Sequence, residues 1–209
     1  MERFSRAGLT FDVHDSGPRD GPVVVLLHGF PQFNDSWDAV AARLTAAGLR
    51  CVAPNQRGYS PGARPEGRRA YRMSELVEDI DALIDATGAG RVHLVAHDWG
   101  AAAAWQYAAA HPERLASFNP LAVPHGAAFL RALVSSRQFF RSYYMYLFQL
   151  PAVPERLLVG GDGTQWRRLS TLLQTTHQSK ERADRDAKAM ADSGALHYAI
   201  NWYRGIPLS

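Results

Sequence analysis

The chain of 209 residues has one cysteine, two lysines and no long hydrophobic run. A single cysteine excludes an internal disulfide, and the apolar segment LRCVAP around Cys51 favours a small core residue over a nucleophile. No apolar run approaches the roughly 18 residues of a membrane span, and the N-terminus has no signal-peptide core. We therefore expect a soluble, cytoplasmic protein that makes no membrane contact.

Lysine is scarce, and arginine supplies almost all of the positive charge. The formal net charge is +3. Acidic and basic residues alternate in KERADRD at 180–186, which is typical of a solvated helix face. A nucleic-acid-binding surface would gather its basic residues, so nucleic acid is excluded as a partner. No metal, nucleotide or flavin motif occurs, so no cofactor is predicted, and the sequence does not indicate an oligomeric state.

The first part of the chain alternates strand-like and helix-like segments. Hydrophobic residues make up 46% of the sequence, enough to build a globular core. Continuous apolar runs predict buried strands of a parallel sheet, with helices on both faces. The predicted strands are 23–27, 49–53, 92–96 and 115–123, and the predicted helices are 36–47, 100–110 and a helix capped by Ser74 that ends at Gly88.

The second part has no strand-like run. Helical patterns cover 127–149, 166–190 and 196–204, and a turn is expected at 160–163. We therefore predict two parts, an α/β core at 1–125 and a helical cap at 126–209.

Residues 95–101 read VAHDWGA and lie between a predicted strand and an alanine-rich helix. A sharp strand–turn–helix connection needs small flanking residues, and Ala96 and Gly100 meet that need. This layout is typical of a nucleophile elbow with Asp98 at its apex and His97 before it. The competing interpretation is that Asp98 caps the following helix.

A second motif, HGFP, directly follows the strand at 23–27 and has the form of an oxyanion loop. We expect the backbone N–H groups of Phe30 and Trp99 to point at one spot beside Asp98. A carboxylate attacks a saturated carbon bearing a leaving group, and these donors would stabilise charge on its own oxygen when water attacks the ester. The four residues of the loop are His28, Gly29, Phe30 and Pro31.

With these motifs the sequence resembles the α/β-hydrolase superfamily, and within it the epoxide hydrolases. The resemblance implies that two cap tyrosines donate hydrogen bonds to the epoxide oxygen. They would be Tyr203 in NWYR and Tyr144, although the neighbouring Tyr143 and Tyr146 are alternatives to Tyr144. The matching segments are HGFPQFNDSW at 28–37, APNQRGYSPGARP at 53–65, VHLVAHDWGA at 92–101, YYMYLFQLP at 143–151 and NWYR at 201–204.

The implied function is hydrolysis of epoxides to diols, with water and a small apolar epoxide as reactants. Phe30, Trp99 and Phe148 are expected to bind the substrate. An apolar pocket is expected from the aromatic residues Phe139, Phe140, Phe148 and Trp202.

Three alternatives stay open. Haloalkane dehalogenases share Asp98–Trp99 and hold the halide with the indole, but they usually carry Asn or Trp where this chain has Phe30. Fluoroacetate dehalogenases typically place arginine after the aspartate. A non-catalytic binding protein or inactive fragment with this fold is the third alternative.

The family pattern also requires a histidine that activates water and an acid that orients it, both beyond the cap. The chain stops at Ser209, so we expect an N-terminal part that lacks the C-terminal strands, leaves a sheet edge unpaired and has poor stability. Among the eight histidines none is expected to be the base, and His125 is the least implausible substitute. Asp162, in GGDGT, is interpreted as a turn residue.

Overall fold

A six-stranded sheet with strand order β1-β2-β4-β3-β5-β6 forms the centre of the protein. The computed structural model describes residues 1–137, 140 and 142–208. Strands β4, β3, β5 and β6 run parallel to one another, whereas β1 and β2 form an antiparallel hairpin whose β2 pairs antiparallel with β4. The predicted α/β fold with a mostly parallel sheet is therefore confirmed. The strands are β1 Arg3–Arg6, β2 Leu9–Ser16, β3 Val23–Leu27, β4 Arg50–Pro54, β5 Val92–His97 and β6 Leu115–Leu121.

The helices agree with the predicted segments except at four places. The segment 127–149 is not one helix, because α4 ends at Ser135 and α6 begins at Tyr143. Ser74 does not cap a helix, because it lies inside the first turn of α2, whose N-cap is Arg72. The segment 166–190 is interrupted between α8 and α9, where His177 has a φ of 67°. Helix α7 was not predicted. The α-helices are α1 Asp38–Ala46, α2 Met73–Thr87, α3 Trp99–Ala110, α4 Gly126–Ser135, α6 Tyr143–Leu147, α7 Val153–Val159, α8 Arg167–Gln174, α9 Lys180–Ser193 and α10 Leu196–Gly205, and short 3-10 helices span Asn34–Trp37, Pro61–Ala63, Arg68–Tyr71, Pro112–Arg114 and Ile206–Leu208.

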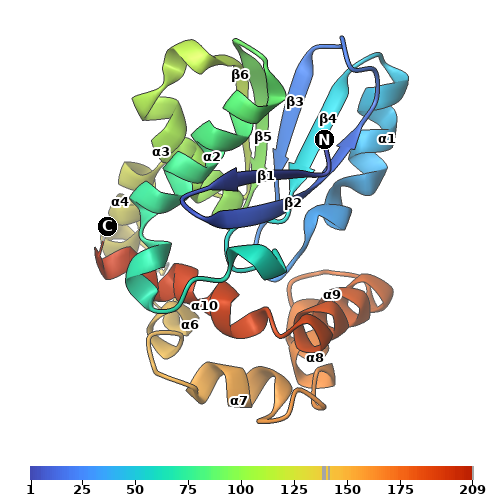
Figure 1. Ribbon diagram of the computed structural model, residues 1–209. Coiled ribbons are helices and arrows are strands. Elements are labelled where there is room, and N and C mark those ends of the chain that lie inside the picture. Colours follow the sequence, from blue (N-terminus) through green and yellow to red (C-terminus); the bar gives the residue numbers. More distant parts are fainter. Residues whose placement is uncertain (138–139, 141, 209) are drawn as a thin grey trace.

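All five residues of β3 are buried. Because successive side chains of a strand point to opposite faces, β3 contributes to a core on each side of the sheet. Val25 and Leu27 enter the larger core, on the face covered by α2 and α3, whereas Val24 and Leu26 enter a smaller core with Cys51 under α1. Figure 1 shows α1 on one side of the sheet and α2 and α3 on the other. Burial raises the pKa of the Cys51 thiol, in agreement with its predicted role as a core residue.

The α1 face of the sheet is covered unevenly. On β5, Leu94 and Ala96 are completely buried under α3, whereas Val95 and His97 on the opposite face are only half-buried. Within the described residues β6 pairs with β5 alone and so forms an edge of the sheet, and Leu121 at its end is 46% exposed. An unpaired edge strand was predicted, and it lies here.

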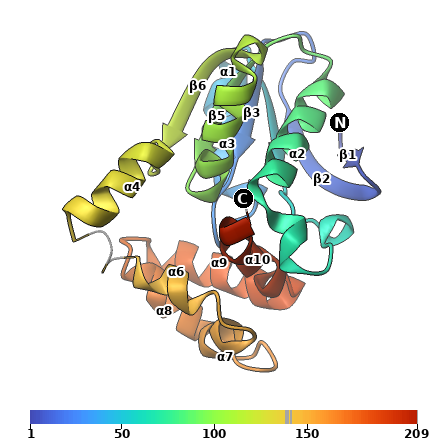
Figure 2. The ribbon, with the colours of Figure 1, turned by 90° about the vertical axis from the view of Figure 1, so that its left-hand side faces the viewer.

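Residues 126–208, which we call the helical segment, lie across the end of the sheet where the parallel strands finish (Figures 1 and 2). Long-range hydrogen bonds join the two parts. The Trp202 indole donates to the Arg57 carbonyl at 2.7 Å, and Arg64 donates to the Ser193 carbonyl at 2.7 Å. We propose the boundary between the parts at 125/126, where the chain passes from β6 to α4.

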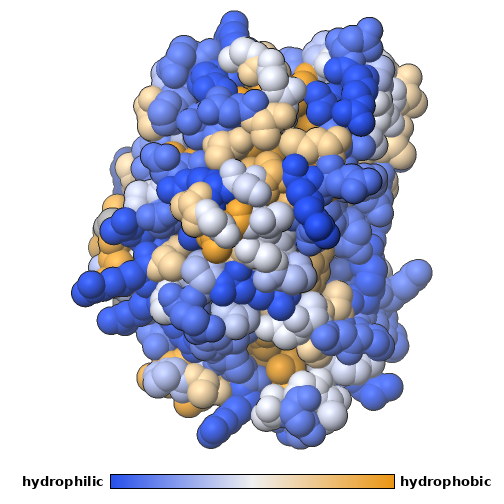
Figure 3. All heavy atoms as spheres, viewed as in Figure 1, coloured by the Kyte–Doolittle hydropathy of each residue, from blue (hydrophilic) through white to orange (hydrophobic). Residues whose placement is uncertain are grey.

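The surface seen in Figure 3 is mostly hydrophilic, and hydrophobic residues appear there in small, separated patches. Elsewhere α4 and α6 expose larger side chains, including Leu130 at 65%, Val134 at 88% and Tyr143 at 64%. No helix in the described part of the chain is long and apolar enough to cross a bilayer.

Candidate active site

The turn between β5 and α3 places Asp98 at the end of a central strand. Asp98 has φ 50° and ψ −121°, a backbone conformation that costs a non-glycine residue about 1–3 kcal/mol. The turn is tight because α3 packs against the end of β3: a Cβ on Gly100 would lie 2.6 Å from the His28 carbonyl oxygen. Asp98 occupies the N-cap position of α3, as the alternative interpretation has it, but its side chain makes no capping hydrogen bond.

Two backbone donors meet at the Asp98 carboxylate. The Phe30 N–H donates to Asp98 Oδ1 at 2.8 Å, and the Trp99 N–H at the start of α3 lies close enough to this side chain to lower its pKa. Gly29 allows the approach, because a Cβ there would lie 2.4 Å from Asp98 Cβ. The structure thus brings together both predicted oxyanion donors, and Pro31 continues the loop into the pocket wall.

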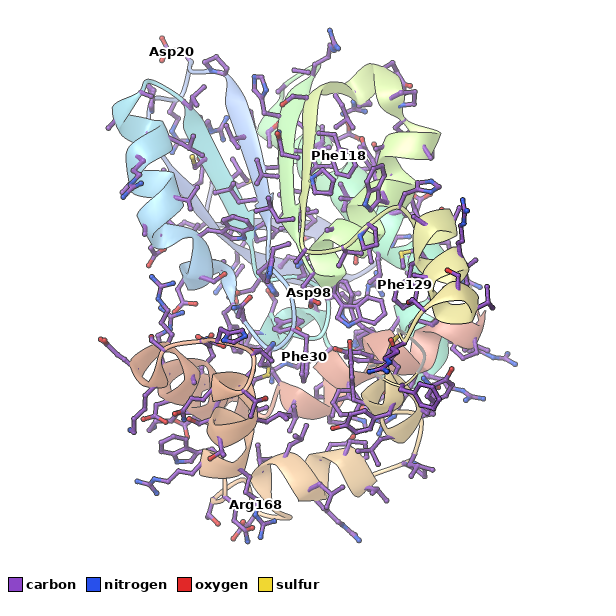
Figure 4. All side chains as sticks on the ribbon, turned by 180° about the vertical axis from the view of Figure 1, so that it is seen from behind. Asp20, Phe30, Asp98, Phe118, Phe129 and Arg168 are labelled. Atoms are coloured by element: carbon purple, nitrogen blue, oxygen red, sulfur yellow. The ribbon has the colours of Figure 1, made fainter. Side chains whose placement is uncertain are left out.

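Burial raises the pKa of Asp98 above its ordinary value, and this effect exceeds the opposing effects of the Phe30 and Trp99 N–H groups and of the nearby His97. The carboxylate is therefore poorly solvated although two donors hold it. An anion with few water neighbours is a stronger nucleophile than a fully hydrated one. Figure 4 shows Asp98 and Phe30 between the sheet and the helical segment, far from Arg168 at the outer end of that segment.

Tyr203, on α10, is 5% exposed and faces this carboxylate from the helical segment. Its ring lies 4.8 Å from that of Trp99 and 5.5 Å from that of Phe30. Burial and the charge of Asp98 raise the pKa of Tyr203 well above the ordinary value, so the phenol stays protonated. The Gln149 amide holds the Tyr203 carbonyl at 2.8 Å and thereby fixes α10 against α6.

Tyr144, on α6, is the second phenol at the site. Its ring centroid lies 6.0 Å from that of Tyr203, and burial together with the charge of Asp98 raises its pKa. Tyr143 also lines the pocket but is 64% exposed, whereas Tyr146 is 54% exposed and does not line it. Of the three tyrosines, Tyr144 is therefore the one whose position fits the predicted role.

A pocket with a volume of about 700 Å³ extends from Asp98 between the sheet and the helical segment. Phe30 and Phe148 line it as predicted, and leucines of α7 and α8 continue the apolar wall. Three residues predicted for the pocket do not line it: Phe140 is 75% exposed, and Trp99 and Trp202 are buried with their rings 6.0 Å apart. Phe139 lies outside the described residues. The apolar wall also includes Leu147, Leu158, Leu169, Leu172 and Leu173.

The far end of the pocket is polar, and the sequence did not reveal it. Arg185 of α9 lies 3.6 Å from Asp35 of the Asn34–Trp37 turn and 2.8 Å from Asp186, which is only 2% exposed. The segment 180–186 was interpreted as a solvated face, which is wrong for Asp186. The polar end of the pocket forms only because α9 packs on a turn some 150 residues earlier in the chain. No local sequence pattern predicts such a contact. The polar lining also includes Gln32, Ser36, Asp38, His177, Gln178 and Arg182.

The histidines divide into those at the pocket and those away from it. His97 and His177 line the pocket, whereas His28, the first residue of the oxyanion loop, is buried. His125 accepts a hydrogen bond from the Ala127 N–H as the cap of α4, and its ring packs on Trp105 at 5.2 Å. Asp162 bonds the Thr164 hydroxyl and N–H, as expected of a turn residue.

Comparisons with known proteins agree with this geometry. The chain belongs to the family of proteins with the alpha/beta hydrolase fold, whose model matches residues 22–194. It is 35% identical over 201 residues to AB hydrolase superfamily protein YfhM of Bacillus subtilis, covering 95% of this chain and 70% of that protein. It is 38% identical over 168 residues to epoxide hydrolase A of Mycobacterium tuberculosis, covering 78% and 51%.

The structure of epoxide hydrolase VrEH1 from Vigna radiata superposes with a TM-score of 0.80 at 32% identity, covering 99% of this chain and 73% of that chain. The chain is thus an epoxide hydrolase-like α/β hydrolase, as predicted. The matched region spans between about half and three quarters of the lengths of these relatives.

Proposed function

We propose that the chain opens apolar epoxides through a covalent ester on Asp98. The observation that carries this proposal is the meeting of a carboxylate, held by two N–H donors, with the protonated phenol of Tyr203. The named epoxide hydrolases among the relatives support the substrate class. The pocket's apolar wall suits an aryl or alkyl substituent on the ring.

In the first step, the free carboxylate oxygen of Asp98 attacks an epoxide carbon and the ring C–O bond breaks. The electron pair passes to the epoxide oxygen, which takes a proton from Tyr203, with Tyr144 donating a second hydrogen bond. The product is a hydroxyalkyl ester on Asp98. The resulting Tyr203 phenolate regains a proton from solvent, because its raised pKa makes the neutral phenol the stable form.

In the second step, water attacks the ester carbonyl and negative charge develops on the oxygen held by Phe30 and Trp99. One such donor contributes about 3 kcal/mol to similar reactions. We propose that this step is slow in the present chain. The supporting observation is that, among the described residues, His28 and His125 are engaged in structural hydrogen bonds.

The test is the intact mass of the protein before and after incubation with styrene oxide. We expect one added substrate mass, mapped by peptide analysis to Asp98, and no addition to an Asp98→Asn variant. Unmodified wild-type protein, shown by its melting curve to be folded, would refute the nucleophile. Release of diol without a lasting adduct would refute the slow second step, and His97 and His177 would then be tested as bases.

A parallel incubation with a chloroalkane separates the two enzyme classes. A dehalogenase would release chloride and carry the alkyl group on Asp98. We expect little chloride, because Trp99, whose indole would hold the halide, packs on Tyr203 at 4.8 Å and does not line the pocket. A binding protein would show neither adduct.

A further inference from the structure

The orientation of the Gly29–Phe30 peptide decides whether the oxyanion hole exists. In a trans peptide the C=O and N–H groups point in opposite directions. The Gly29 carbonyl is held by two groups, His28 Nδ1 at 3.1 Å and the Gln32 N–H at 3.0 Å. The Phe30 N–H on the other side of the same peptide is thereby directed at Asp98.

The His28 ring can hold this carbonyl in only one tautomer. The Gln56 backbone N–H donates to His28 Nε2 at 3.1 Å, so Nε2 must accept and Nδ1 must carry the proton in the neutral ring. His28 is 1% exposed, and burial lowers its pKa to about 4, which keeps the ring neutral at neutral pH. The same arrangement would fail if Nε2 were protonated, because two donors would then face each other.

Gln56 holds His28 at a second point. Its side-chain amide donates to the His28 carbonyl at 2.6 Å, and Gln56 is itself only 7% exposed. The same carbonyl lies against α3, where a Cβ on Gly100 would approach within 2.6 Å. A buried amide therefore fixes the peptide before Gly29, while the imidazole fixes the peptide after it.

We propose that His28 and Gln56 are positioning residues that set the oxyanion hole by locking the Gly29–Phe30 peptide with its N–H toward Asp98. The hydrogen-bond chain runs from the Gln56 N–H to His28, from His28 to the Gly29 carbonyl, and across that peptide to Asp98. Neither residue lines the large pocket, so neither touches substrate. The expected effect of this lock on the reaction rate rests on the proposed function. Its expected effect on the titration of Asp98 does not.

Two variants break the lock at different strengths. His28→Phe keeps an aromatic ring but removes both ring nitrogens, whereas Gln56→Met keeps the length of the side chain and removes only the amide donor. Gln174→Met is the control, because the Gln174 amide donates only within α8, to Ser170 at 3.2 and 3.3 Å. Retained melting cooperativity shows that each variant is folded.

The first readout needs no substrate: NMR titration of isotope-labelled aspartate carboxyls, with Asp98 assigned by its loss in Asp98→Asn. The Phe30 N–H lowers the pKa of Asp98, so freeing that peptide must raise the titration midpoint. We expect the largest rise in His28→Phe, a smaller one in Gln56→Met and none in Gln174→Met. His97, Tyr59, Tyr144 and Tyr203 also act on or respond to Asp98, and all variants retain them.

The second readout is the rate at which the styrene oxide ester on Asp98 is hydrolysed, followed by intact mass. The oxyanion donors act in this step, so we expect a fall of about 100-fold or more in His28→Phe, the scale of one lost oxyanion donor. Folded variants with an unshifted Asp98 midpoint would overturn the proposal, and Gln56→Met alone decides if His28→Phe does not fold. A shifted midpoint in protein that styrene oxide never alkylates would uphold the lock and refute the proposed function.

Discussion

The two parts of the molecule supply the site in different ways. The α/β core contributes groups fixed by the backbone, namely the elbow at Asp98 and the N–H donors of Phe30 and Trp99. The helical segment contributes side chains, Tyr144 and Tyr203, that long-range contacts carry to the same place. The nucleophile thus depends on local geometry and the acids depend on packing, and substitutions in the two parts should fail in different ways.

The largest effect is expected from Gly29→Ala in the core. The new Cβ would lie 2.4 Å from Asp98 Cβ and 2.7 Å from Oδ1, so the carboxylate or the loop must move. A displacement of about 1 Å can cost about 100-fold in rate, and we expect at least that loss in Asp98 alkylation measured by mass spectrometry. Gly90→Ala is the matched control, because its Cβ would meet nothing within 4 Å. Equal rates in both variants would show that the close approach at Gly29 is unimportant.

A smaller effect is expected from Tyr203→Phe in the helical segment. Loss of a general acid costs about 100-fold or more, but the second phenol can replace part of its contribution. We therefore expect a fall in alkylation near the lower end of that range, and a smaller fall in Tyr144→Phe because that side chain is 39% exposed to water. Tyr146→Phe, on the same helix as Tyr144 but outside the pocket, should react at the wild-type rate. Similar losses at all three tyrosines would indicate a packing role instead.

The same division governs what could be predicted from the sequence. The elbow and the oxyanion loop have short motifs because strand, sharp turn and helix follow one another directly, so Asp98, Phe30 and Trp99 were found together. The polar end of the pocket has no motif, because Asp35 and Arg185 meet only through the packing of α9. Aromatic content alone wrongly placed Trp202 in the pocket, since composition does not reveal which side of α10 faces it.

Asp98 is expected to cost the core stability. Its pKa is raised in the folded protein, so the folded state binds the proton more tightly than the unfolded state. The free energy of unfolding should therefore fall as pH rises from the unfolded value toward the raised pKa, relative to Asp98→Asn. We expect the variant to melt at a higher temperature than wild type at neutral pH, with the difference vanishing in acid. Asp162→Asn, in an exposed turn, should not show this gain.

The smallest effect is expected at the ion pair that joins the two parts. Arg185 and Asp35 lie 3.6 Å apart with 45% and 46% of their side chains exposed, and such pairs contribute about 0–1 kcal/mol. Burial also raises the pKa of Asp35, so its charge is partly unfavourable where it lies. Asp35→Asn should therefore change the free energy of unfolding in urea by no more than about 0.5 kcal/mol.

The contrasting variant is Asp79→Asn, which breaks the buried pair with Arg57 at 2.6 and 2.7 Å and should cost about 3–5 kcal/mol. A large loss in Asp35→Asn would mean that charge, rather than the apolar contacts around Tyr203, holds the helical segment on the core.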